Sequence, residues 1–455
     1  MKGGKKSTGL WRGLTAVTAS LLAVTVGGTA IANANAAFLN SRLGTSSYEY
    51  VEIGSGDEDT SYFDSEFSSL NEVVEAKNAL AEEISEEGTV LLKNENSALP
   101  LNSGSETVTL WGLNSHNPTY GGMIGSSPIA NAEAGQPQYS IEAALAEKGF
   151  TLNQNMIDLY SSDAAAAYAR AGGHSLQPSF GPIYENPASY AVGEAPASIY
   201  TDDVLSSADD TVAVVVLTRD SSEAANYSVN MTNATEGDSF ERPLALSDYE
   251  KAMIELAKEH STKVVVLLNA TNPLEIGDLK GDDEIDAIVW TGLPGLNGFL
   301  GVADVLSGEV NPSGHISDTY ASFSNSSPAM VNWGVYMYTN NSQSGEANAL
   351  TAENKADWYV VESEGIYTGY KYYETRYEDS VLGQGNATAT DGAYGSNTWK
   401  YEYEVVYPFG YGLSYTTFEQ TLDSVTCEVG GEGTAQVTVT NTGDVAGKSV
   451  AQLYV

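Results

Sequence analysis

Polar residues that follow an apolar run are the first group in this sequence that could do chemistry. Val212–Leu217 is almost entirely β-branched or apolar, which predicts a strand buried in a parallel sheet, and the polar stretch Arg219–Glu223 follows it. Ligands of open α/β sheets bind outside the carboxyl ends of the strands, where this cation, these hydroxyls and the Glu223 carboxylate are expected to lie. Glu223 is therefore the first candidate for a catalytic group. The alternative is a solvated loop with a surface ion pair.

Other residue types that often carry catalysis are sparse. Cys427 is the single cysteine, which excludes an intramolecular disulfide and a CxxC motif. We predict no metal site, because no HxxxH or HxH spacing joins the histidines, which are His116, His174, His260 and His315. The glycine-rich stretch Tyr120–Ser127 follows a predicted strand over Val108–Leu113, but it has neither GxGxxG nor GxxxxGK[ST]. No cofactor is predicted, and a nucleotide-binding, flavodoxin-like domain is only a third hypothesis.

The net charge of the chain limits the classes of partner that it can bind. The 455 residues include 60 Asp and Glu against 20 Lys and Arg, which gives a formal net charge of −40. Such a surface repels phosphate backbones and anionic lipids, so we predict no nucleic-acid partner. A chain of this length has room for several domains, each with its own core.

The elements that would position Glu223 alternate along the chain. Ser247–Glu250 is a capping box that begins a helix extending to about His260. Lys263–Leu268 and Ile285–Trp290 are further buried-strand patterns, and the helix predicted over Leu296–Leu306 follows them. Strands that alternate with helices at this spacing predict a mostly parallel sheet covered by helices, an α/β sandwich. The turn after Trp290 should lie at the same edge of the sheet as Glu223.

Upstream of the central strand, further helices are expected. Asn71–Glu87 has apolar residues at helical spacing and ends at Gly88, which suits the left-handed position after a helix. Strand-like residues follow at Thr89–Leu92, and shorter helices are predicted over Ile141–Lys148 and Ala164–Ala171.

The amino terminus has the pattern of an export segment. Basic residues up to Arg12 precede the uncharged stretch Gly13–Ser41, which is apolar from Leu14 to Ile31 and contains Ala34-Asn35-Ala36. Its apolar part approaches the ~20 residues that span a bilayer, so cleavage after Ala36 and retention as an anchor both stay open. We assign residues 1–37 to a signal peptide or membrane anchor and residues 38–69 to an acidic spacer, and we expect the remainder outside the cytoplasmic membrane, extracellular or at the cell surface.

Six ordered blocks of the sequence resemble glycoside hydrolase family 3, with the β-glucosidases as the nearest match. They are EEGTVLLKNENSALPL (Glu86–Leu101), the strand and loop that end at Glu223, DAIVWTGLPGLNG (Asp286–Gly298), ADVLSGEVNPSG (Ala303–Gly314), EGIYTGYKYYETRY (Glu364–Tyr377) and VYPFGYGLSYTTF (Val406–Phe418). The resemblance implies that residues 70–418 form the family's α/β-sandwich domain. Residues 419–455, which have apolar residues at period two, would be the first strands of a fibronectin type III-like β-sandwich, in a member with permuted domain order.

The resemblance also implies roles for individual residues. Arg219–Ala224 is similar to the RxSGEG-type loop that carries the acid/base glutamate, which assigns that role to Glu223. Ser222 and Ala224 stand where the loop usually has glycine, and Glu236 is the main rival for the acid role. The implied substrate-binding residues are Arg219, Ser222 and Ser126, the last from a loop similar to a GxGS motif.

A retaining glycosidase also needs a second carboxylate ~5–5.5 Å from the acid, as nucleophile. The family's nucleophile is an aspartate on a (β/α)8 barrel, and the 37 residues after Phe418 cannot hold the ~250 that a barrel needs. Asp357-Trp358 resembles the family's nucleophile dipeptide, but no buried strand precedes it, so chance is the better interpretation. We therefore expect the acid/base part of a β-glucosidase, incomplete and inactive alone, with a barrel from sequence beyond Val455. The alternative is a non-catalytic cell-surface remnant that binds carbohydrate or mediates adhesion.

Overall fold

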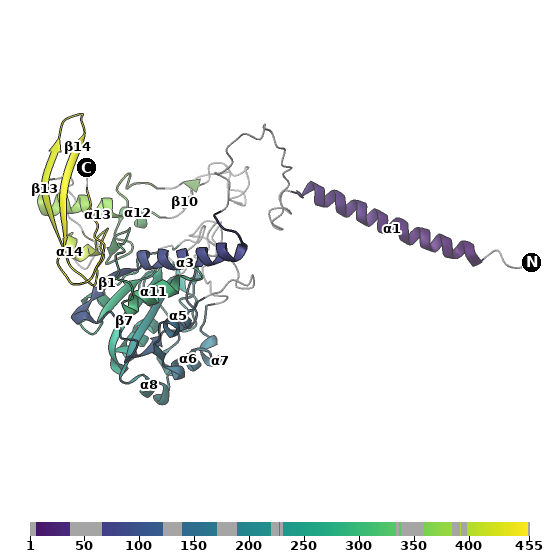
Figure 1. The fold of residues 1–455 in the computed structure, drawn as a ribbon, viewed down its shortest axis with the longest axis horizontal. Coiled ribbons are helices and arrows are strands. Elements are labelled where there is room, and N and C mark those ends of the chain that lie inside the picture. The colour runs from purple at the N-terminus through teal and green to yellow at the C-terminus, as the bar shows by residue number, and fades with distance from the viewer. Residues whose placement is uncertain are drawn as a thin grey trace, which may run out of the picture. The chain divides into compact units, whose positions relative to one another are not determined.

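The computed structural model forms two compact units, Met1–Ser68 and Ser69–Val455. The residues that the structure describes are 6–36, 66–121, 139–170, 189–219, 227, 231–333, 336–337, 358–359, 361–384, 392 and 398–453. The first unit contains helix α1 (Lys6–Ala34), drawn in purple in Figure 1. Its segment Gly9–Ala34 has a mean hydropathy of 1.7 and is long and apolar enough to cross a membrane, a criterion that signal sequences also meet. The predicted spacer lies mostly outside the described residues.

A six-stranded sheet forms the centre of the second unit (Figure 1). In spatial order its strands are β1 (Val90–Asn94), β8 (Ala287–Trp290), β7 (Ser261–Ala270), β5 (Thr211–Arg219), β2 (Thr107–Trp111) and β3 (Thr151–Leu152). All neighbouring strands are parallel except β1, which pairs antiparallel with β8. The predicted mostly parallel sheet is confirmed, with an antiparallel strand added at one edge.

The position of β5 in the middle of the sheet explains why its sequence is a continuous apolar run. Every residue of β5 is buried. Ala213, Val215 and Leu217 enter one core cluster, together with residues of helix α9 (Asp248–His260). The alternate residues Val212, Val214 and Val216 enter a second cluster, which helix α11 (Gly298–Ser307) and helix α5 (Ile141–Glu147) cover. Because successive side chains point to opposite faces, a strand covered on both faces has an apolar middle, here Val212–Leu217.

Further helices and paired strands belong to the second unit. The remaining helices are α3 (Leu70–Gly88), η2 (Glu95–Ser97), α4 (Leu113–His116), α6 (Gln154–Tyr160), α7 (Asp163–Ala166), η5 (Ala197–Ile199), α8 (Asp202–Ala208), α10 (Gly277–Gly281), α12 (Pro328–Val331), α13 (Tyr370–Tyr377), η6 (Glu378–Leu382) and α14 (Tyr401–Glu404). The remaining strands form two-stranded pairs, β4 (Ser189–Tyr190) with β6 (Thr232–Asn233), β9 (Tyr320–Ala321) with β12 (Val405–Tyr407), β10 (Tyr336–Met337) with β11 (Trp358–Tyr359), and β13 (Phe418–Cys427) with β14 (Gly433–Asn441). The antiparallel hairpin of β13 and β14 matches the period-two pattern after Phe418.

Two predicted helix ends differ from the structure. Gly88 is the last residue of α3 instead of the left-handed residue after it, because Thr89 ends the helix with its amide donated to the Ser85 carbonyl. Helix α7 covers only Asp163–Ala166 of the longer alanine-rich stretch, and the Ser162 hydroxyl caps its start. Alanine favours a helix at every position, so composition alone does not define where such a helix ends.

Helix α3 crosses α11 at a glycine. A Cβ atom on Gly301 would lie 2.6 Å from the Glu82 carbonyl oxygen and 2.8 Å from the Glu86 amide nitrogen, both of which are rigid backbone atoms. Gly301→Ala should therefore push the two helices apart and lower the free energy of unfolding by about 1–3 kcal/mol. Urea unfolding measures this. Gly88→Ala is the matched control, because a Cβ atom on Gly88 would meet no atom within 4 Å and alanine favours the helix. Equal stability of the two variants would contradict the close packing.

Candidate functional site

Three parallel strands end at one edge of the sheet, which we call the carboxyl edge. Arg219, the last residue of β5, pairs with Ala270 of β7, and Leu268 of β7 pairs with Trp290 of β8. The turn after Trp290 therefore lies at the same edge as the end of β5, as predicted. Glu223 and Ser222 follow this end in the sequence but lie outside the described residues, as do Ser126 and Asp357. Their roles remain predictions.

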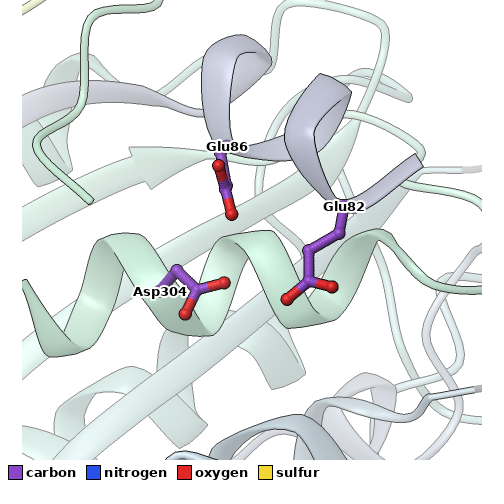
Figure 2. Close-up of side chains that lie close together, drawn as sticks. All are labelled: Glu82, Glu86 and Asp304. Carbon is purple, nitrogen blue, oxygen red and sulfur yellow. The ribbon is translucent and has the colours of Figure 1, made fainter. Parts of the chain in front are cut away.

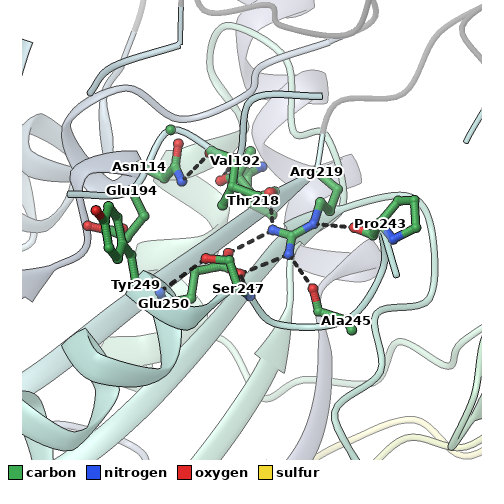
Figure 3. Close-up of polar contacts among 12 residues, drawn as sticks. Asn114, Val192, Glu194, Thr218, Arg219, Pro243, Ala245, Ser247, Tyr249 and Glu250 are labelled. Carbon is green, nitrogen blue, oxygen red and sulfur yellow. Dashed lines mark hydrogen bonds and ion pairs between the residues drawn. The ribbon is translucent and has the colours of Figure 1, made fainter. Parts of the chain in front are cut away.

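Arg219 is fully buried, and its five N–H groups are all used within the chain (Figure 3). Nε donates to the Pro243 carbonyl at 2.8 Å, and Nη1 and Nη2 donate to the Thr218 and Ala245 carbonyls at the same distance. The other two N–H groups bind both oxygens of Glu250, at 2.7 and 2.8 Å. A sugar hydroxyl would have to displace one of these bonds. The geometry thus makes Arg219 an anchor that fixes the start of the segment carrying Glu223, rather than a free donor.

The Glu250 carboxylate holds both Arg219 and the start of α9. Its Oε2 accepts the Ser247 amide at 2.8 Å, while the Ser247 hydroxyl accepts the Glu250 amide at 3.2 Å, so the predicted capping box is confirmed. Burial alone would lower the pKa of Arg219, but the Glu250 charge outweighs it and raises that pKa. Arg219 therefore stays charged inside the protein, and its pairing with Glu250 joins the carboxyl end of β5 to the first turn of α9.

Glu236, the rival for the acid role, lies in the segment between β6 and α9. It is exposed, and the Tyr249 hydroxyl donates to its backbone carbonyl at 3.4 Å. Asp238, two residues later, is tied to the start of α9 because it accepts the Tyr249 amide at 3.0 Å. Glu236 thus has a backbone held by Tyr249 and a side chain exposed to solvent.

Sequence reasoning missed Glu194, a carboxyl group with no exposed surface (Figure 3). Its oxygens accept the Leu113 amide at 3.1 and 3.2 Å and the Ala195 amide at 2.9 Å. Burial raises the pKa of Glu194 to about 8, so it is largely protonated at neutral pH. In the sequence, Glu194 is a lone acidic residue among small and apolar residues, which is the only signal that could have indicated it.

Loss of the Glu194 proton should make the fold less stable in alkali. Its pKa is raised from 4.5 to about 8 in the folded chain, so the folded state holds the proton more tightly than the unfolded state. The stabilising contribution is complete below about pH 4.5 and is lost as the pH rises through about 8. Glu194→Gln, which cannot ionise, should flatten the fall in unfolding free energy between pH 5 and pH 9 in urea titrations. The exposed Glu402→Gln should leave that slope unchanged; a wild-type slope in Glu194→Gln would contradict the assignment.

A second group of carboxyls lies where α3 crosses α11 (Figure 2). Oxygens of Glu82, Glu86 and Asp304 lie within 4.8 Å of one another. Burial raises the pKa of Asp304 to about 7. The Lys148 ammonium forms ion pairs with Asp304 and, at 3.8 Å, with Glu82. Lysine thus supplies the positive charge here, and the group is best understood as a helix-packing contact.

The second unit is similar to known proteins. Residues 89–415 match the model of the Glycosyl hydrolase family 3 C-terminal domain. The chain is 29% identical over 400 residues to Beta-glucosidase A of Butyrivibrio fibrisolvens, and the match covers 81% of this chain and 40% of that protein. It is 26% identical over 380 residues to the Periplasmic beta-glucosidase of Salmonella typhimurium, covering 82% and 40% of the two chains. The solved structure of a beta-glucosidase from Paenibacillus barengoltzii superposes with a TM-score of 0.56 at 25% identity, over 80% of this chain and 33% of that one. The chain thus spans less than half the length of these relatives.

Proposed function

The chain belongs to glycoside hydrolase family 3, and from this premise we propose that it supplies the acid/base domain of an enzyme that hydrolyses terminal β-glucosidic bonds with retention. The observation that carries the proposal is the carboxyl edge. There the end of β5 is fixed by Arg219 and Glu250, directly before the segment that resembles the family's acid/base loop. The named β-glucosidases among the relatives support the substrate class.

In this proposal the reaction needs two carboxyl groups from two domains. Glu223 donates a proton to the leaving glycosidic oxygen, and its carboxylate then takes a proton from the water that releases the sugar. The nucleophile comes from a (β/α)8 barrel encoded beyond Val455. Rigid attachment of the loop matters because proton transfer requires hydrogen-bond distance to the leaving oxygen. The Arg219–Glu250 pair supplies that rigidity at the start of the loop.

The proposed location is outside the cytoplasmic membrane. Helix α1 has the length and apolar composition of a signal sequence or a membrane anchor, and basic residues precede it. Basic residues before an apolar segment favour an orientation in which the rest of the chain is exported. Residues 419–455 are proposed to begin a fibronectin type III-like domain, to which the β13 and β14 hairpin would contribute its first strands.

Residues 37–455 alone should fold without hydrolysing 4-nitrophenyl β-glucoside. Glu223 can offer a proton, but without a nucleophile and the sugar-binding groups of a barrel nothing stabilises the oxocarbenium-like transition state. Circular dichroism would verify folding, and release of nitrophenol would be compared with buffer. Turnover that disappears in Asp357→Asn would assign the nucleophile to Asp357. Turnover that survives this change would place the whole site in this segment and contradict the two-domain proposal.

A further inference from the structure

Asn269 interrupts the apolar run of β7 close to the carboxyl edge. It is fully buried, it follows the apolar residues Val264–Leu268, and it pairs with Thr218 of β5. A polar amide in such a place destabilises a fold unless its hydrogen bonds are made. The two N–H groups and the oxygen of the Asn269 side chain are all bonded, and their partners show what the side chain does.

The side chain of Asn269 binds two loops. Its Oδ1 accepts the Thr119 amide at 2.7 Å and its Nδ2 donates to the Thr119 carbonyl at 2.9 Å, so both polar groups of that residue's backbone are held. Nδ2 also donates to the Gly292 carbonyl at 2.7 Å. Thr119 belongs to the segment after β2 and α4, and Gly292 belongs to the turn after β8. One buried amide thus joins loops that follow two different strands of the sheet.

The order of the strands gives this contact its consequence. Strand β5 lies between β2 and β7, so the segment after β2 must extend across the carboxyl end of β5 to reach Asn269. Near that end, the Thr218 hydroxyl donates to the Asn269 Oδ1 at 3.4 Å. Ser126 lies seven residues after Thr119, and Glu223 lies five residues after Thr218. The Asn269 side chain therefore holds together the starts of both segments that carry candidate site residues.

A second buried side chain holds Thr119 from another direction. The Arg170 guanidinium donates to the Thr119 hydroxyl and to the side-chain oxygen of Asn114, both at 2.9 Å. Thr119 is only 1% exposed. Its backbone is thus fixed by Asn269 and its side chain by Arg170, so the start of the loop that leads to Ser126 has a defined position.

We propose that Asn269 is a positioning residue for substrate binding, which fixes the start of the loop that leads to Ser126 against the turn after β8. The inference rests on the proposed function, in which Ser126 is one of the substrate-binding residues. Asn269 is fully buried, so it acts through the loop and not on the sugar. A hydroxyl–hydroxyl hydrogen bond needs about 2.5–3.0 Å between the oxygens, so a loop displaced by about 1 Å would lose such a bond to the sugar.

Asn153 is a matched control on another part of the sheet. It is also a buried asparagine, whose Nδ2 donates to the Thr109 hydroxyl at 3.0 Å and to the Ser207 carbonyl at 2.9 Å. The Thr109 hydroxyl bonds in turn to that of Thr211, the first residue of β5, at 2.8 Å. Asn153 therefore joins elements near the amino-terminal end of β5, away from the carboxyl edge. Alanine at Asn153 or at Asn269 removes a buried, fully used amide, so the two variants should lose similar stability.

Hydrogen exchange measured by mass spectrometry tests the positioning in the whole chain, kept in detergent because of α1. The reporter is the Gly295 amide, which donates to the Tyr120 carbonyl at 2.8 Å and so spans the two loops. In Asn269→Ala, exchange at Gly295 should speed up by at least about fivefold, because the loops lose the side chain that joins them. In Asn153→Ala it should match the wild type. Unchanged exchange at Gly295 in Asn269→Ala would overturn the proposal. If Asn269→Ala does not fold, Asn269→Ser, which retains a polar group there, is measured in the same way.

In a protein that includes the proposed barrel, the positioning should affect KM and not kcat. Asn269→Ala should raise KM about five- to tenfold for both cellobiose and 4-nitrophenyl β-glucoside, as Ser126→Ala should. Where Ser126 is already alanine, Asn269→Ala should raise KM by less than about twofold, because the contact that it positions is gone. Asn153→Ala should leave KM unchanged for both substrates. Multiplying effects of Ser126→Ala and Asn269→Ala on KM, or a fall in kcat alone, would overturn the proposal.

The positioning role and the proposed function fail separately, because hydrogen exchange needs no turnover. Glu223-dependent hydrolysis with an unchanged KM in Asn269→Ala would refute the positioning role and leave the proposed function standing. Faster exchange at Gly295 in Asn269→Ala, together with no hydrolysis by the barrel-containing wild type, would refute the proposed function.

Discussion

Glu223→Gln, in a protein that includes the proposed barrel, should lower kcat/KM for cellobiose by about 10²–10⁴-fold, which is the usual contribution of a general acid. Glutamine has nearly the same size as glutamate but cannot donate a proton to the leaving oxygen. The loss should be much smaller for an aryl glucoside such as 4-nitrophenyl β-glucoside, whose leaving group needs little protonation. Steady-state kinetics on both substrates measure this difference, which a merely structural residue would not produce.

Glu236→Gln is the matched control for Glu223. Glu236 is exposed, and it is the other candidate that the resemblance left for the acid role. We expect wild-type kinetics from Glu236→Gln on both substrates. A loss of kcat/KM in Glu236→Gln, with none in Glu223→Gln, would assign the acid role to Glu236. The Arg219–Glu250 pair would then not hold the acid/base loop.

Glu250→Gln should be among the most destabilising single changes in the described part of the second unit. The substitution leaves the Arg219 charge buried without its counterion, and breaking a buried ion pair by removing one partner costs about 3–5 kcal/mol. Glutamine can still accept the Ser247 amide, so the capping box survives and the loss reports on the ion pair. Urea unfolding of wild type and variant measures the difference.

Two further variants test the ion pair. The exposed Lys251, which lies 3.9 Å from Asp248, should tolerate replacement by alanine with a loss below about 1 kcal/mol. The double variant Arg219→Met/Glu250→Met removes both charges, but it also leaves the Pro243, Thr218 and Ala245 carbonyls without their Arg219 donor. If it still loses less stability than Glu250→Gln, the unpaired Arg219 charge dominates the loss in Glu250→Gln. If Glu250→Gln and Lys251→Ala lose the same small amount, Arg219 does not depend on Glu250.

Sequence patterns that depend on neighbouring residues predicted most elements of the sheet and its covering helices. The apolar run Val212–Leu217 appears as β5, and Ser247–Glu250 caps α9, because both features arise from residues a few positions apart. The strands over Lys263–Leu268 and Ile285–Trp290 were found for the same reason, although β8 begins only at Ala287. Element ends were less accurate, as Gly88 shows, because they depend on which hydrogen bond closes the last turn.

The sequence by itself determined the buried strands, the capped helix and the candidate carboxyl after β5. These features depend on side-chain periodicity and local hydrogen bonds, which involve residues only a few positions apart. Only the tertiary structure decided that Arg219 binds Glu250 and that burial raises the pKa of Glu194. Arg219 and Glu250 lie 31 residues apart in the sequence, and Glu194 lies 81 residues from Leu113, whose amide it accepts. They meet because the parallel sheet brings the carboxyl ends of β2 and β5 to one edge. Burial there removes the water that would otherwise screen their interactions.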